Sequence, residues 1–292
     1  MHWTEEAARA LSKAPFFVRK FARRKVEEHV RGQGRDTVTL DDVRGLRDAA
    51  RGKDDGDLSP SAIEDLVADL TRESEQATVE QPGYYLRVCG GAFGCPRALV
   101  DLSPLRDRVV AALEAADLET MLRERHPGPL LRHHKFRVAL AACTNACSEP
   151  QTKDFGAVGQ ARPGATGAEC TRCGECAVAC REQALTVDHE GPHFDRDKCI
   201  LCGDCVRACP TGHLAAAKAG YGIMLGGRLG RRPRLAREVA ALAGEDEVME
   251  MLSWALDVFR RETGPRERFA EAVDRVGWPA GGTAGHREEP AS

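Results

Sequence analysis

The residues best suited to chemistry in this chain are its 12 cysteines, all of which lie between Cys89 and Cys209. The segments before and after this window contain no cysteine. A disulfide framework is typical of small secreted chains, whereas thiols gathered in one window of a larger chain favour metal or cluster ligation. Scattered structural thiols would not be confined to one window. The spacing of the cysteines therefore decides which chemistry is expected.

Two runs in this window share the spacing C-x2-C-x2-C-x3-C. They are Cys170, Cys173, Cys176 and Cys180, followed by Cys199, Cys202, Cys205 and Cys209. In bacterial ferredoxins such a run gives three ligands to one [4Fe–4S] cluster and the fourth to the other cluster. We therefore expect a Cys170 set (Cys170, Cys173, Cys176, Cys209) and a Cys199 set (Cys199, Cys202, Cys205, Cys180). A pair of zinc sites is the alternative, but four-cysteine zinc sites usually show two separated C-x2-C knuckles.

The other four cysteines form two shorter pairs, which we call the Cys89 set. Cys89 and Cys95 have the spacing C-x5-C, and Cys143 and Cys147 have the spacing C-x3-C. Each pair alone is a weak signal, because C-x3-C on a helix merely places two thiols on one face. Together the two pairs supply four thiolates from two loops, which is enough for a third [4Fe–4S] cluster.

The sequence around the Cys89 set resembles the siroheme-dependent sulfite and nitrite reductases. HHKFRVALAACTNACSEPQTKDFGAVG (133–159) is similar to the strand, loop and second strand around that family's C-P-N-x-C motif, with Ala142 and Thr144 where glycine and proline are usual. GGRLGRRPRLA (226–236) and ERF (267–269) resemble segments of the small anaerobic and dissimilatory-type sulfite reductases, which also carry a ferredoxin insert. The resemblance covers roughly residues 84 to 277. It implies that Cys147 bridges the third cluster to a siroheme iron.

Siroheme carries many carboxylates, and sulfite and nitrite are anions, so such a site needs a basic lining. As catalytic residues the resemblance suggests Lys135, Arg137, His134 and Lys153. As cofactor-binding residues it suggests Arg97, Arg132, Gly226, Gly227, Arg228, Arg231 and Arg234, together with Cys147. His133 and Arg232 are further candidates. Each basic side chain taken alone has the simpler interpretation of a residue that faces water.

The N-terminal segment is expected to be helical. Thr4 and Pro15 bound a first helix, a second runs from about Phe16 to Arg31, a third starts near Thr39, and a fourth opens at Ser59. The opening residues, about 1–45, resemble the small domain that closes the B subunit of light-independent protochlorophyllide reductase. The basic run in this segment comprises Arg19, Lys20, Arg23, Arg24 and Lys25. It is a solvated helix face, or a docking site for an acidic redox partner or a nucleic acid.

The fold class we expect is α+β. The predicted segments are a helical domain (1–53), a linker with a helix (54–83), a sulfite reductase-like α/β cluster domain (84–160 plus 218–278), a ferredoxin-like βαβ insert (161–217) and a disordered tail (279–292). Between the two ferredoxin runs, ALTVD (184–188) and HFDRD (193–197) are expected to be short strands. Three further helices are expected at about 233–243, 246–262 and 264–276. GYGIMLGG (220–227) departs from a dinucleotide fingerprint and lacks a βαβ context, so no nicotinamide site is expected.

Composition limits the remaining choices. The chain has 292 residues with 42 basic and 45 acidic side chains, a net charge of −3, which does not favour a general nucleic-acid binder. No apolar run is long enough to span a membrane, and the opening residues lack a secretory signal, so a cytoplasmic protein is expected.

Three functions fit the sequence. The first is an iron–sulfur oxidoreductase that passes electrons from two ferredoxin-type clusters to a third cluster coupled to siroheme, with sulfite or nitrite as its small anion substrate. The second is a three-cluster electron-transfer protein without siroheme that serves a partner reductase. The third is an iron–sulfur interaction protein that uses the basic N-terminal helices. The first two functions require a redox partner protein. The resemblance implies a ferredoxin-like α/β half domain before the first cysteine pair, but only about ten residues separate the last N-terminal helix from Cys89. A partner chain or a second copy would therefore complete a siroheme site.

Overall fold

The computed structural model describes residues 1–12, 19–51, 77–93 and 95–279, and the chain divides into two compact units, Met1–Glu75 and Gln76–Ser292. The fourth predicted helix, from Ser59, and most of the predicted tail lie outside the described residues. Each unit is described by itself.

The described residues of the first unit form three helices and two very short strands. They are β1 (His2–Trp3), α1 (Glu5–Ser12), α2 (Arg19–Gly32), β2 (Thr37–Val38) and α3 (Leu40–Arg51), and β1 pairs with β2 in parallel. Ala7, Val26, Val30 and Val38 form the buried core. Thr39 and Asp42 start α3, because the Asp42 carboxylate accepts bonds from the backbone N–H and the hydroxyl of Thr39, at 2.8 and 2.7 Å.

The second unit contains a six-stranded mixed sheet in the order β10-β9-β6-β5-β4-β3. Its strands are β3 (Thr78–Glu80), β4 (Tyr84–Val88), β5 (Phe136–Ala141), β6 (Phe155–Ala165), β9 (Leu214–Leu225) and β10 (Arg237–Ala243). β4, β5 and β6 are parallel, and the other pairs are antiparallel. The mixed sheet with separate helical segments confirms the α+β class.

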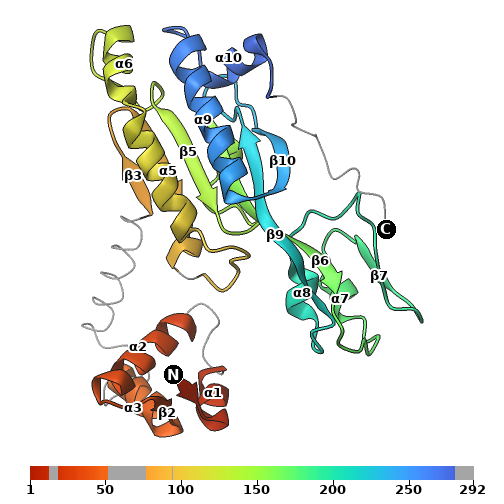
Figure 1. Ribbon diagram of the computed structural model, residues 1–292. Helices are drawn as coiled ribbons and strands as arrows, with labels where there is room; N and C mark the ends of the chain where they lie inside the picture. Colours follow the sequence, from red (N-terminus) through yellow and green to blue (C-terminus); the bar gives the residue numbers. More distant parts are fainter. Residues whose placement is uncertain (13–18, 52–76, 94, 280–292) are drawn as a thin grey trace. The chain divides into compact units, whose positions relative to one another are not determined.

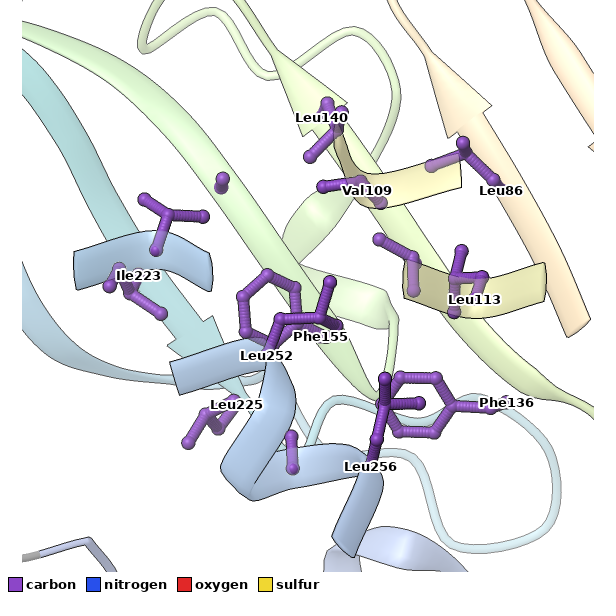
Figure 2. Packing of buried hydrophobic residues seen from close by; sticks show 14 of the residues in the cluster. Leu86, Val109, Leu113, Phe136, Leu140, Phe155, Ile223, Leu225, Leu252 and Leu256 are labelled. Atoms are coloured by element: carbon purple, nitrogen blue, oxygen red, sulfur yellow. The ribbon is translucent and has the colours of Figure 1, made fainter. Parts of the chain in front are cut away.

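Helices cover one face of this sheet. α5 (Ser103–Ala115) and α9 (Glu245–Glu262) lie side by side on it, and the shorter α6 (Leu118–Arg125) and α10 (Phe269–Val276) follow them in the chain (Figure 1). Every second residue of the strands points toward these helices, as the period of a strand requires. Figure 2 shows the resulting core, in which Phe136 and Phe155 meet Leu252 and Leu256 of α9.

The opposite face of the sheet is covered by a loop with a short 3-10 turn, η2 (Pro150–Thr152). A Cβ on Gly156 would lie 2.7 Å from the Cβ of Pro150, so a glycine is needed where this loop crosses β6. A second short 3-10 turn, η1 (Gly90–Phe93), follows β4.

The ferredoxin-like segment is inserted between the two strands of the longest antiparallel pair. β6 and β9 stay in register from Phe155 opposite Leu225 to Ala165 opposite Leu214, with one irregularity at Arg162 and Pro163. Between these strands lie α7 (Glu175–Val178), β7 (Leu185–Val187), β8 (Pro192–Phe194) and α8 (Asp204–Ala208) (Figure 1). β7 and β8 pair antiparallel, which confirms the two predicted strands.

The C-terminal predictions have mixed outcomes. The helix expected at 246–262 is confirmed as α9. The helix expected at 233–243 is wrong, because Arg237–Ala243 forms the edge strand β10 beside β9. Its alanines favour a helix, but the free edge of β9 offers backbone partners that sequence periodicity does not reveal, and this pairing overrides the local preference. The last helix starts at Phe269, later than expected, because Gly264–Arg268 forms a turn.

Candidate iron–sulfur centres

Two cavities in the ferredoxin-like segment are each lined by four cysteines. The Cys170 set lines one and the Cys199 set lines the other. Each cavity therefore gathers three cysteines from one run and one from the other run, which is the grouping expected for two [4Fe–4S] clusters.

The two cysteine loops have the same backbone conformation. Arg172 precedes Cys173 and Leu201 precedes Cys202, and both have a positive φ, of 57° and 60°. Gly174 and Gly203 follow those cysteines and also have a positive φ, of 79° and 68°. This repeated left-handed pattern turns each loop around its cavity, so the wrapping is built into the backbone.

Burial disfavours deprotonation of the free thiols in these two sets. It raises the pKa of Cys205 to about 11, and it also raises the pKa of Cys202 and of Cys176. A buried thiolate needs a nearby positive charge, which iron supplies. Backbone N–H groups contribute as well, since Ala184 donates to Cys180 Sγ at 3.3 Å and Leu214 to Cys209 Sγ at 3.4 Å. The residues present therefore fit iron–sulfur clusters.

The Cys89 set is assembled at one edge of the sheet. β4 and β5 are parallel neighbours with Val88 opposite Leu140, so the loops that follow them carry Cys89 and Cys143 at the same edge. The pKa of the Cys143 thiol is raised by burial, and the other three thiols of the set lie close enough to raise it further. The N–H groups of Gly91 and Ala142 donate to Cys89 Sγ at 3.3 and 3.2 Å. The structure thus brings all four thiols together.

Cys147 differs from the other members of this set in its exposure. Cys143 is buried and Cys89 and Cys95 are half-buried, whereas Cys147 is exposed. Asn145 Nδ2 donates to its Sγ at 3.1 Å, and the intervening Ala146 has a positive φ of 52°. A thiolate that holds a cluster on one side and a second metal on the other requires such an outward position.

Two cations pair with Glu149, which lies two residues after Cys147, and the sequence indicated only one of them. Glu149 pairs with the predicted Lys153 at 3.2 Å and with Arg87 of β4 at 3.4 Å. Lys153 is 9% exposed, and burial lowers its pKa. Arg87 was not among the residues predicted from the sequence. Arg87 lies two residues before Cys89, and strand alternation places it on the opposite face of β4 from Leu86 and Val88. This placement was the signal available in the sequence.

The other predicted basic residues are mostly engaged elsewhere. Arg137 holds the buried Asp154 and donates to Gly227 O at 3.2 Å. Arg228 pairs with Glu271 at 2.6 Å, and Arg234 pairs with Asp274. The side chains of Arg231 and Arg232 are exposed and make no ion pair within the described residues.

Gly226 and Gly227 were expected to let the backbone approach a ligand. A Cβ on Gly227 would lie 2.5 Å from Gln151 O and 2.7 Å from Lys153 O, so the close approach is to the chain's own loop. Gly226 has a positive φ of 74°, which starts the turn leading to Arg228.

A third group of predicted residues lies away from the Cys89 set. Arg132, His133, His134 and Lys135 precede β5, while Cys143 follows it. At about 3.3 Å per residue of strand, Lys135 and Cys143 are separated by about 26 Å. Lys135 and Arg132 both pair with Glu80, at 2.9 and 3.2 Å.

Arg97 lies between two cysteine sets. It follows Cys95 and pairs with Asp204 of α8 at 3.7 Å. A Cβ on Gly203 would lie 2.8 Å from Leu99 Cδ2, and Ala161 N donates to Leu201 O at 2.8 Å. These contacts bring the loop of the Cys199 set against the loop of the Cys89 set.

The described ranges contain neither a single-metal site nor a membrane-spanning helix. No three His, Cys, Asp or Glu side chains there converge in the way needed to hold a single metal ion. None of the helices in those ranges is both long and apolar enough to cross a membrane.

Comparison with known protein families gives a match to each part of the chain. The model for the nitrite and sulphite reductase 4Fe-4S domain matches residues 87–280, and that for the proto-chlorophyllide reductase 57 kD subunit matches residues 3–47. The chain is 31% identical over 224 residues to the coenzyme F420-dependent sulfite reductase of Methanocaldococcus jannaschii, covering 76% of this chain and 34% of that protein. It is 46% identical over 52 residues to the B subunit of light-independent protochlorophyllide reductase from Chlorobium limicola, covering 18% and 10%.

Solved structures give matches of the same kind. Dissimilatory sulfite reductase I has a TM-score of 0.46 and 17% identity, covering 70% of this chain and 55% of that chain. The Mycobacterium tuberculosis NirA protein has a TM-score of 0.37 and 19% identity, covering 75% and 30%. The chain thus spans about a third of the length of the archaeal reductase and a tenth of the Chlorobium protein.

Proposed function

We propose that this chain, which belongs to the nitrite and sulphite reductase 4Fe-4S domain family, passes electrons through three [4Fe–4S] clusters to a siroheme held at Cys147. The observation that carries the proposal is the gathering of the 12 cysteines into three sets of four, two of them around separate cavities. Membership of this 4Fe-4S domain family supports, in general terms, the function of an iron–sulfur oxidoreductase. The number of clusters and the siroheme are our additions to it.

The contacts between the sets give the electron path a direction. The Cys199 set meets the Cys89 set through Gly203 and Leu99 and through the pair between Asp204 and Arg97. Within the described residues, the Cys170 set makes no such contact with the Cys89 set. We therefore assign the Cys170 set as the point of entry, the Cys199 set as the intermediate carrier and the Cys89 set as the last cluster.

Cys147 is the residue that would ligate the siroheme iron, because it is the exposed thiol of the last set. Cys147 would hold the siroheme next to the cluster of the Cys89 set, and the bound group would supply the redox chemistry needed to reduce an anionic substrate. Asn145 would fix the thiolate through its amide. Arg87 and Lys153 would offer cations to carboxylates or to an anionic substrate, in exchange for their present partner Glu149.

The substrate and the partners follow from this assignment. Sulfite or nitrite is the proposed substrate class, and the name of the archaeal relative favours sulfite. The electron donor would be a separate redox protein that docks near the Cys170 set. Since the chain spans about a third of that relative, a partner chain or a second copy would supply the rest of the siroheme wall. Free thiols in this number fit a reducing compartment such as the cytoplasm.

A three-cluster carrier without siroheme is the second candidate. It is favoured by the pairing of Arg137, Arg228 and Arg234 with carboxylates of the same chain, which leaves fewer cations for a macrocycle. Cys147 would then be an ordinary cluster ligand.

The experiment that separates these candidates is an iron count with an absorption spectrum. The chain is purified without oxygen from cells that make siroheme. About thirteen iron atoms per chain and a siroheme spectrum support the proposal, and about twelve with only a cluster shoulder support the carrier. Cys147→Ser should abolish the siroheme bands and retain the ferredoxin-type clusters. The matched variant Cys209→Ser should damage the Cys170 set and retain the siroheme bands. Siroheme bands that survive Cys147→Ser would overturn the ligand assignment.

A further inference from the structure

A cavity of about 310 Å³ lies at the end of β5 that is remote from the cysteines. Its walls come from the end of α6, from the segment before β5 and from the turn before α10. His126, His133, His134, Thr263 and Arg268 are among its lining residues. It is separated from Cys143 by the whole of β5, so it is distinct from the site proposed above.

Three imidazoles form one wall of this cavity. The rings of His126 and His134 are stacked with centroids 4.0 Å apart and an angle of 2°, and His133 meets His134 edge-on at 4.2 Å. The pKa of His134 is lowered by burial and by the neighbouring histidines and Arg268. Leu131 N donates to His134 Nδ1 at 3.2 Å, so a neutral His134 carries its proton on Nε2 as a hydrogen-bond donor.

Two buried polar groups on the opposite wall lack a partner. Thr263 is 6% exposed, and its Oγ1 makes no hydrogen bond within the described structure. Arg268 Nη2 is likewise buried without a partner there. A buried donor without an acceptor is costly, by about 1–3 kcal/mol, and a guanidinium can only donate. The missing partner is therefore a hydrogen-bond acceptor.

The charges around the cavity favour an anion. The four nearby carboxylates already have cationic partners, namely Asp154 with Arg137, Glu267 with Arg275, Glu80 with Lys135 and Glu271 with Arg228. Arg125 donates to the Phe259 carbonyl at 3.3 Å. Arg266 is exposed and Arg268 half-buried, and neither side chain forms an ion pair within the described residues, although Asp154 and Glu271 lie close enough to raise the pKa of Arg268 against the effect of its burial. The cavity thus retains uncompensated positive charge.

We propose that this cavity is a binding site for a phosphate-like oxyanion, free or as the terminal group of a small ester. Arg268 and Thr263, whose unpartnered Nη2 and Oγ1 atoms become accessible when their side chains rotate toward the cavity, donate to its oxygens together with His134 Nε2 and His133. Arg266 closes the open side. No group in this proposal is a cluster ligand, so binding does not depend on cluster content.

The test titrates inorganic phosphate into the full chain, purified without oxygen in a buffer free of oxyanions, by isothermal calorimetry. We expect saturable binding that Arg268→Gln weakens by at least about tenfold, because a charge-assisted hydrogen bond is lost. The control Arg232→Gln removes the same charge from an exposed position and should leave binding unchanged. Thr263→Val, which keeps the side-chain shape, should also weaken binding and serves if Arg268→Gln does not fold.

The outcomes are distinct from those of the iron count. No binding at about 20 mM phosphate, or equal weakening by Arg268→Gln and Arg232→Gln, would overturn the proposal. A parallel titration with glycerol phosphate identifies the source, since tighter binding of the ester than of inorganic phosphate points to an organic ligand. Loss of siroheme in Cys147→Ser with phosphate binding retained would separate this site from the proposed redox site.

Discussion

The pair between Arg137 and Asp154 allows a direct test of whether a predicted catalytic residue is structural. The guanidinium of Arg137 donates from Nε and Nη2 to the two carboxylate oxygens of Asp154, each at 3.0 Å, and from Nη2 to Gly227 O. The side chains are 12% and 2% exposed. Replacing Arg137 by Met leaves the Asp154 carboxylate buried with only the Arg137 N–H, at 2.9 Å, as a remaining donor.

The expected cost follows from this burial. Removing one partner of a buried, fully hydrogen-bonded ion pair typically costs about 3–5 kcal/mol. With a urea dependence of about 2 kcal/mol per M, Arg137→Met should lower the unfolding midpoint by about 2 M. Arg137→Lys keeps the charge but not the bidentate geometry, so its urea midpoint should fall between those of Arg137→Met and the wild type.

Urea titrations followed by tryptophan fluorescence, in reducing buffer without oxygen, provide the measurement. Arg123→Met is the matched control, because Arg123 and Glu119 are 59% and 41% exposed and such pairs contribute less than about 1 kcal/mol. An Arg137→Met midpoint within about 0.3 M of the wild type would refute the structural interpretation. Loss of sulfite reduction in a variant of unchanged stability would instead support the catalytic role expected from the sequence.

Two further predictions concern backbone and cap geometry. Gly227→Ala should destabilise the second unit by more than about 2 kcal/mol, because the added Cβ would clash with Gln151 O and Lys153 O. The control Gly167→Ala should be neutral in the same urea assay, because a Cβ at Gly167 meets nothing within 4 Å. Asp42→Asn should destabilise the first unit by about 1 kcal/mol at pH 7. The Arg35 guanidinium and the Thr39 N–H lower the pKa of Asp42, so this stabilisation is present at neutral pH and is lost as the pH falls below about 4. A variant that unfolds in acid as the wild type does would contradict the Asp42 prediction.

Ligand grouping was predictable because the cysteine spacing is a local property. Each run fixes a loop that supplies three ligands to one cluster, and the ferredoxin pattern assigns the fourth cysteine to the other cluster, so the grouping of Cys209 with the Cys170 set was predictable. The helix at Glu245–Glu262 was predictable for a similar reason, since its acidic first turn and its apolar stripe are both local signals.

The roles of the basic residues were not predictable in this way. Arg228 meets Glu271 and Arg234 meets Asp274 only because α10 packs beside the turn after β9, and no local pattern reveals this. The glycine at 227 did indicate a close approach, but the sequence does not say whether the second group is a ligand or the chain itself. The strand β10 was missed because its alanine-rich sequence favours a helix, and its pairing with the preceding strand β9 overrides that preference.

The β6–β9 ribbon explains how two cluster-binding segments can share one chain without losing their geometry. Its register continues unbroken from the core of the sheet to Ala161 opposite Ala219, where Ala161 also bridges to Cys202. The loop of the Cys199 set is therefore held to the sheet by backbone bonds, and Gly203 permits the contact with Leu99. Backbone ladders are more rigid than exposed ion pairs, so the distance between the Cys199 and Cys89 sets should survive loss of the Arg97–Asp204 pair. Magnetic coupling between the two reduced clusters, measured by electron paramagnetic resonance, should accordingly be unchanged in Arg97→Gln. A coupling that disappears in this variant would show that the side-chain pair, and not the ribbon, sets the distance.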